Sequence, residues 1–155
     1  MQDQLGLTAH QAVGVTGIAL SAAAACSVTA QTLAIRFRPA AWLLVLLGAV
    51  GVVGAAAAVE LIRLPLVLMV AVGTMGAGFG SMTLGISTSA SLLTRPGQQG
   101  AVAGSLASAG SLGAIVSALA IMPFYERLPF LPYGTVGVLG IFVAVGGFLA
   151  PRPGR

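Results

Sequence analysis

Residues 41–59 have the sequence AWLLVLLGAVGVVGAAAAV, which contains no charged side chain and no Ser, Thr, Asn or Gln. A helix of about 20 apolar residues crosses the roughly 30 Å of hydrocarbon in a bilayer. Strands of a membrane barrel would need about ten residues of alternating polarity, which this stretch lacks. Because backbone in lipid must satisfy its own hydrogen bonds, residues 41–59 predict a transmembrane helix.

Four other stretches have the same character and a similar length. Short breaks that contain charged residues and prolines separate them, such as Arg36–Pro39 and Arg95–Gly97. The complete set of predicted spans is 12–35, 40–59, 65–93, 100–124 and 134–150. The sequence therefore predicts an all-α fold, in which residues 1–155 form a single transmembrane domain of about five helices.

Composition supports a membrane location and excludes an ordinary soluble domain. Hydrophobic residues make up 57% of the chain and charged residues 6%, whereas a soluble domain carries about 25% charged residues. The net charge of +4 comes from arginines that are scattered between apolar runs. They indicate membrane topology rather than nucleic-acid binding, and no nucleic-acid partner is expected.

The charged residues also predict an orientation. If the spans alternate, Arg36, Arg38, Arg95, Arg152 and Arg155 fall on one side, while Asp3, Glu60, Arg63, Glu126 and Arg127 fall on the other. Cytoplasmic loops carry an excess of Lys and Arg. We therefore expect the N-terminus outside and the C-terminus in the cytoplasm, and the high Ala, Gly and Arg content suggests a bacterial inner membrane.

Patterns that would support catalysis or metal binding are missing from the sequence. It has no phosphate-binding loop, and its single cysteine, Cys26, and single histidine, His10, form no metal-ligand spacing. Asp3, Glu60 and Glu126 all fall in predicted loops. We expect no enzymatic activity, no cofactor and no metal site.

Polar residues are concentrated in three of the five spans. The second and fifth spans are nearly free of them, as expected of lipid-facing helices. In the third span, Thr74, Gly78, Ser81, Gly85 and Thr88 recur at helical spacing along one stripe. Such a stripe could face a cavity, or it could pack tightly against a neighbouring helix.

Both readings have candidate residues in this sequence. We expect a substrate cavity to be lined by Ser27, Gln31, Thr74, Ser81, Thr88 and Ser108. Close helix packing is expected at Gly76, Gly80, Gly100, Gly104 and Gly113, because small residues let helix backbones approach one another.

Three segments carry a resemblance to a known family. Residues 5–12 (LGLTAHQA) resemble an outer loop of drug exporters, and residues 95–104 (RPGQQGAVAG) resemble a cytoplasmic turn and small-residue helix start. Residues 31–38 (QTLAIRFR) resemble the loop signature Gly-x-x-x-Asp-Arg-x-Gly-Arg, of which Arg36 and Arg38 form the remnant. Gln31 and Ile35 replace its Gly and Asp, which puts the conformational latch made by that signature in doubt.

This order of features resembles the C-terminal part of a major facilitator superfamily transporter, about its last five helices. The resemblance implies a fragment of a secondary active transporter that exports small amphipathic or drug-like molecules, as efflux antiporters do. Alternating access would then require an N-terminal half that is missing here. In a second reading, the chain is a self-contained structural or assembly subunit of a membrane complex.

Overall fold

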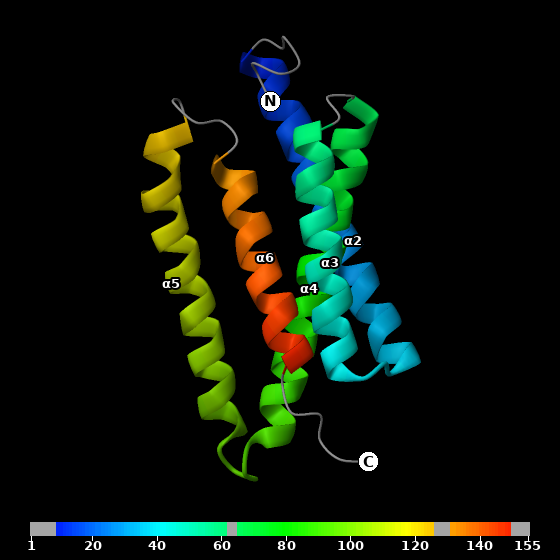
Figure 1. Ribbon diagram of the computed structural model, residues 1–155, viewed down its shortest axis with the longest axis vertical. Coiled ribbons are helices and arrows are strands. Elements are labelled where there is room, and N and C mark those ends of the chain that lie inside the picture. The colour runs from blue at the N-terminus through cyan, green and yellow to red at the C-terminus, as the bar shows by residue number, and fades with distance from the viewer. Residues whose placement is uncertain (1–8, 62–64, 126–130, 150–155) are drawn as a thin grey trace.

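The computed structural model describes residues 9–61, 65–125 and 131–149, and these form five helices (Figure 1). The helices are α2 (Ala9–Phe37), α3 (Ala41–Leu61), α4 (Pro65–Leu93), α5 (Gln99–Tyr125) and α6 (Leu131–Leu149). The described residues contain no strand, so the predicted all-α fold is confirmed. Each predicted span corresponds to one helix, although α2 begins before residue 12 and ends after residue 35.

Four helices contain a segment that is long and apolar enough to cross a membrane. These segments are Val13–Phe37, Ala41–Val59, Leu66–Leu93 and Gln99–Ala120. The described apolar part of α6, Gly134–Val143, is shorter. The prediction of about five spans is therefore confirmed for four helices by length and composition.

The helices run alternately up and down, so that α2 begins and α6 ends at opposite ends of the bundle (Figure 1). α4 packs against α2 on one side and α3 on the other, and α3 also packs against α6. Among the described residues, α5 makes only slight contact, with α4 and α6. The packing order is therefore α2, α4, α3, α6, with α5 standing beside this row.

The position of α3 differs from the prediction of a mostly lipid-facing span. Its buried residues, Ala49, Val52, Ala55, Ala56 and Val59, lie between α4 and α6, and only one face with Leu47 and Val50 is exposed. An apolar surface suits lipid and a helix partner equally well, because acyl chains are as apolar as leucine. Composition alone therefore could not distinguish a lipid-facing helix from a helix that is packed between two others.

Two connections adopt backbone conformations that explain where helices end. Arg38 has a φ of 48°, and its N–H donates a hydrogen bond to the Ala34 carbonyl over 2.8 Å, which ends α2 just before Pro39. Between α4 and α5, the Gln98 N–H donates to the Arg95 carbonyl over 3.1 Å. With Pro96 second and Gly97 third at φ 94°, these four residues have the features of a type II turn.

Candidate functional site

Helix α4 presents glycines to both of its neighbours. On one face, a Cβ atom added at Gly76 would overlap the backbone of Ala23 in α2, and one added at Gly80 would overlap the Ser27 hydroxyl. On the other face, a Cβ at Gly78 would lie 2.7 Å from the Gly48 carbonyl oxygen of α3. The absence of side chains at these positions is what lets three backbones come this close.

Ser27 and Gln31, two predicted cavity residues, are half-buried where α2 meets α4. The Gln31 Nε2 donates a hydrogen bond to the Ser27 Oγ over 3.3 Å. Both side chains also border Gly80, since a Cβ there would lie 3.0 Å from Gln31 Nε2. The structure therefore places this polar pair in a helix contact, directly against α4.

The predicted polar stripe of α4 is divided between exposed and packed positions. Thr74 and Thr88 are exposed, whereas Ser81 is half-buried. Gly78 and Gly85, which lie between them, face α3. The stripe thus follows the α3 contact through its middle, and Thr74, although exposed, still borders α3, since its Cγ2 lies 3.9 Å from a Cβ built at Gly51.

Three hydroxyl groups of α4 are satisfied within the helix. Thr74 Oγ1 donates to the Val70 carbonyl over 2.8 Å, Ser81 Oγ to the Ala77 carbonyl over 2.9 Å, and Thr83 Oγ1 to the Phe79 carbonyl over 2.9 Å. A hydroxyl bonded to its own helix can lie in hydrocarbon without an unmet donor. These side chains are therefore compatible with a lipid-facing surface as well as with a cavity.

Ser108, the remaining predicted cavity residue, lies on α5 and apart from the other candidates. Ser108 is exposed, as are Gly100, Gly104 and Gly113. A Cβ added at any of these three glycines would meet no described atom within 4 Å. The structure therefore does not bring Ser108 together with Ser27, Gln31 or Ser81.

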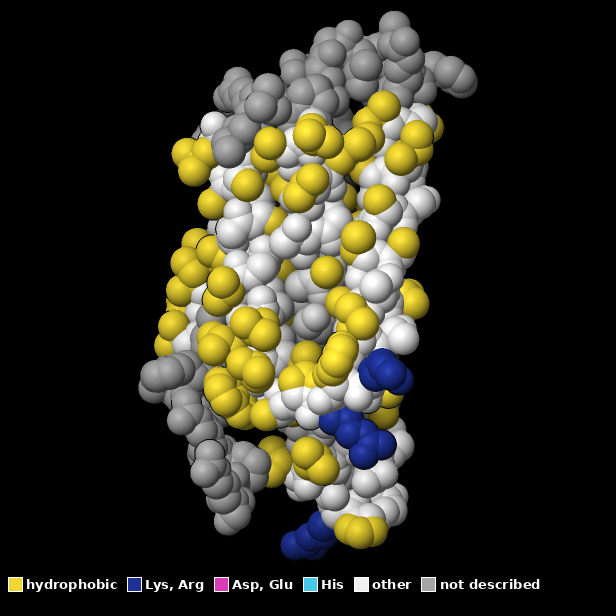
Figure 2. Space-filling model, turned by 90° about the vertical axis from the view of Figure 1, so that its right-hand side faces the viewer, with side chains coloured by type: hydrophobic (Ala, Val, Ile, Leu, Met, Phe, Trp, Pro, Cys, Tyr) yellow, Lys and Arg dark blue, Asp and Glu magenta, His cyan; other side chains and the backbone are white. Residues whose placement is uncertain are grey.

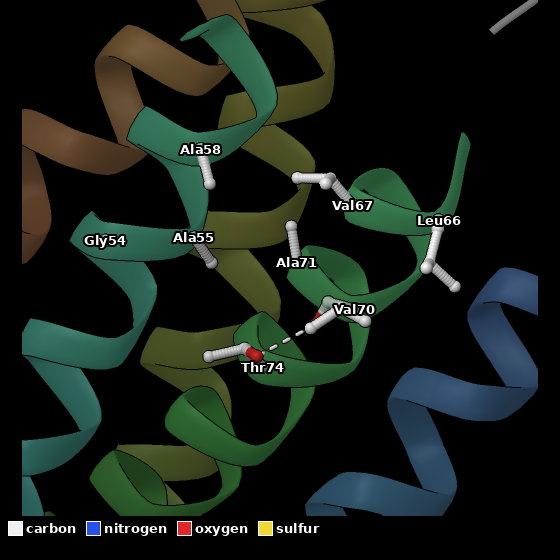
Figure 3. A pocket seen from close by; sticks show the side chains of 8 residues that line it. All are labelled: Gly54, Ala55, Ala58, Leu66, Val67, Val70, Ala71 and Thr74. Carbon is white, nitrogen blue, oxygen red and sulfur yellow. Dashed lines mark hydrogen bonds between the residues drawn. The ribbon is translucent and has the colours of Figure 1, made fainter. Parts of the chain in front are cut away.

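A groove between α3 and α4 was not found by sequence reasoning (Figure 3). It has a volume of about 340 Å³ and is lined by Gly54, Ala55, Ala58, Leu66, Val67, Val70, Ala71 and Thr74. Thr74 contributes the one polar side chain of this lining, and its hydroxyl is turned to the Val70 carbonyl. The wall is apolar, so the groove suits a hydrocarbon group better than a polar ligand.

The groove was missed because seven of its lining residues are apolar and resemble those of any membrane span. The one usable signal was the difference in size between its two walls. Gly54, Ala55 and Ala58 on α3 are small, whereas Leu66 and Val67 on α4 are larger.

Within the part of the chain that the structure describes, no three His, Cys, Asp or Glu side chains are grouped as a metal site. Cys26 is half-buried, and a Cβ at Gly73 would lie 3.3 Å from its Sγ, which places the thiol against α4. Comparison with protein-family models, curated proteins and solved structures gives no match for this chain.

Proposed function

We propose that this chain is part of a secondary active transporter of the major facilitator type, working together with an N-terminal bundle of helices. The whole transporter would export small amphipathic or drug-like molecules by alternating access. The observation that carries this proposal is the uncovered surface of α5.

Between Gln99 and Ala120, none of the side chains of α5 is buried. The surface it exposes is rich in Gly, Ala and Ser, including Gly104, Ser108 and Ser111. Small residues of this kind allow close approach of a second helix, so their exposure points to a partner bundle. Alternating access requires such a partner, because the substrate site lies between two bundles that rock against each other.

The substrate class follows from the chemistry of the available surfaces. Thr88 and Ser108 offer exposed side chains with hydroxyl groups, and the α3–α4 groove offers an apolar wall. The groove has no charged side chain in its lining. Exposed hydroxyl groups and a separate apolar groove, neither with a fixed charge, suit a weakly polar, amphipathic molecule better than an ion or a sugar.

The arginines support an orientation for the proposed transporter. Arg36 lies in the last turn of α2, Arg38 follows the end of α2, and Arg95 lies in the turn between α4 and α5, at the same end of the bundle (Figure 1). By the positive-inside rule, this end faces the cytoplasm and the start of α2 faces outward. We place the protein in a cell membrane, the inner one if the source is bacterial.

Thiol labelling in membranes tests for the proposed cavity. In a Cys26→Ala background, Thr88→Cys and Ser108→Cys should react with a water-soluble, membrane-impermeant maleimide once the partner bundle is present. Val50→Cys is the matched control, because Val50 is also exposed, at 58%, but lies on apolar α3. Silence at all three positions would mean that the Thr88 and Ser108 sites face lipid, and the transport proposal would fail.

The second candidate function, an assembly subunit, is also compatible with the uncovered α5. The transporter and the assembly subunit predict different coding DNA upstream of Met1. An in-frame extension that encodes about seven more spans supports the transporter. An upstream stop codon followed by a ribosome-binding site supports the subunit.

A further inference from the structure

Charge is separated between the two ends of the bundle. The described arginines, Arg36, Arg38 and Arg95, are all exposed. Figure 2 shows arginine side chains gathered at one end of the face it displays. They lie where α2 ends and where α4 turns into α5.

The one acidic residue in the described part of the chain lies toward the opposite end of the bundle. Glu60 is in the last turn of α3, whose 21 residues begin at the arginine end and rise about 30 Å from it. Asp3 precedes the start of α2, and Glu126 follows the end of α5. Within the described part of the chain, the three arginines therefore have no carboxylate side chain at their own end, and an anion from outside these residues can pair with them.

Each arginine adjoins large apolar side chains that are also exposed. Ile35 and Phe37 alternate with Arg36 and Arg38, and Phe37 is 74% exposed. Leu92 and Leu93 precede Arg95, and Leu93 is 84% exposed. Cationic groups beside exposed hydrocarbon match a ligand that has an anionic head and an apolar body.

We infer that this end of the bundle binds anionic phospholipids, with the guanidinium groups of Arg36, Arg38 and Arg95 on the lipid phosphates. The exposed Ile35, Phe37, Leu92 and Leu93 would lie against the acyl chains. Guanidinium binds phosphate through paired hydrogen bonds as well as charge. This lipid selectivity does not depend on whether the protein is a transporter, because it needs only the inserted helices.

Trp42 makes the inference testable, since it is the single tryptophan and is the second residue of α3, at the arginine end. The full chain is reconstituted in dioleoylphosphatidylcholine vesicles that contain increasing amounts of either brominated phosphatidylglycerol or brominated phosphatidylcholine. Brominated phosphatidylglycerol should quench Trp42 fluorescence at a lower mole fraction. Each arginine removed should weaken this preference by about fivefold.

Two variants separate specific binding from a general effect of charge. The triple variant Arg36→Gln, Arg38→Gln, Arg95→Gln should lose about a hundredfold of the preference, because three losses of about fivefold multiply. The control variant Arg63→Gln, Arg127→Gln changes arginines that lie beside Glu60 and Glu126 in the sequence, and it should keep the preference. Substitution of the same three arginines by Lys should keep part of it, and circular dichroism checks that every variant remains helical.

Three results would overturn the inference. Equal quenching by the two brominated lipids would show no selectivity. Loss of selectivity in the control variant would show that net charge alone attracts the lipid. An unchanged preference for brominated phosphatidylglycerol in the triple variant would show that the selectivity does not come from Arg36, Arg38 and Arg95.

Discussion

Gly48 and Gly54 lie on the same helix but have opposite surroundings. A Cβ at Gly48 would lie 2.5 Å from the Gly78 carbonyl oxygen and 2.7 Å from Met82 Cγ, whereas at Gly54 nothing described lies within 4 Å. We expect Gly48→Ala to lower the free energy of unfolding by about 1–3 kcal/mol, because α3 and α4 must move apart. Gly54→Ala should be neutral or stabilising by up to about 1 kcal/mol, because alanine favours the helix. Titration with sodium dodecyl sulfate, followed by circular dichroism, measures both, and equal changes would contradict the tight α3–α4 contact.

Gly97 differs from these helical glycines. A larger residue at position 97 is disfavoured by the backbone conformation and not by contact with neighbouring residues. The φ of 94° at Gly97 is strained for a residue with a Cβ, and Gly97 is the third residue of the turn that follows α4. Gly97→Ala should therefore cost about 1–2 kcal/mol of stability in the same titration. Gly100→Ala is the control, since Gly100 lies within α5 and has no described atom near its Cβ position. A loss in the control as large as that in Gly97→Ala would remove backbone strain as the explanation.

Among whole helices, the contrast between α4 and α5 separates what could be predicted from what could not. Both helices carry rows of small residues, and their spans were predicted because charges and prolines mark the breaks. Gly76 and Gly80 lie against α2, whereas Gly100, Gly104 and Gly113 meet no described atom. A row of small residues encodes the ability to approach another helix closely but not the identity of that helix. The same limit applies to Ser27 and Gln31, because a polar side chain can line a cavity or lie in a helix contact, and the structure shows that both border α4.

This contrast predicts that bulky side chains act differently on the two helices. Gly76→Leu with Gly80→Leu on α4 should cost more than about 3 kcal/mol, because both side chains would enter the α2 backbone region. Gly104→Leu with Ser108→Leu on α5 should change the stability of the full chain by less than about 0.5 kcal/mol, as is usual for exposed positions. Detergent unfolding of the purified chain measures the change in stability for both double variants. A large loss from the α5 substitutions would show that α5 packs within this chain or against a second copy.

For the molecule as a whole, the alternating helices and the separated charges lead to one prediction about orientation. Arg36, Arg38 and Arg95 lie at one end, and α6 finishes at that same end (Figure 1). A green fluorescent protein fused after Arg155 should therefore fluoresce in bacterial cells, and alkaline phosphatase fused there should be inactive, because both results report a cytoplasmic C-terminus.

Replacing the three arginines by Gln removes the charge bias of the α2–α3 and α4–α5 connections, so the same fusions should report a mixture of orientations. The variant Arg63→Gln, Arg127→Gln removes cations from the other two connections of the sequence and should leave the orientation unchanged. An active phosphatase fusion on the unaltered chain would reverse the assignment of both ends, and with it the leaflet whose lipids Arg36, Arg38 and Arg95 contact.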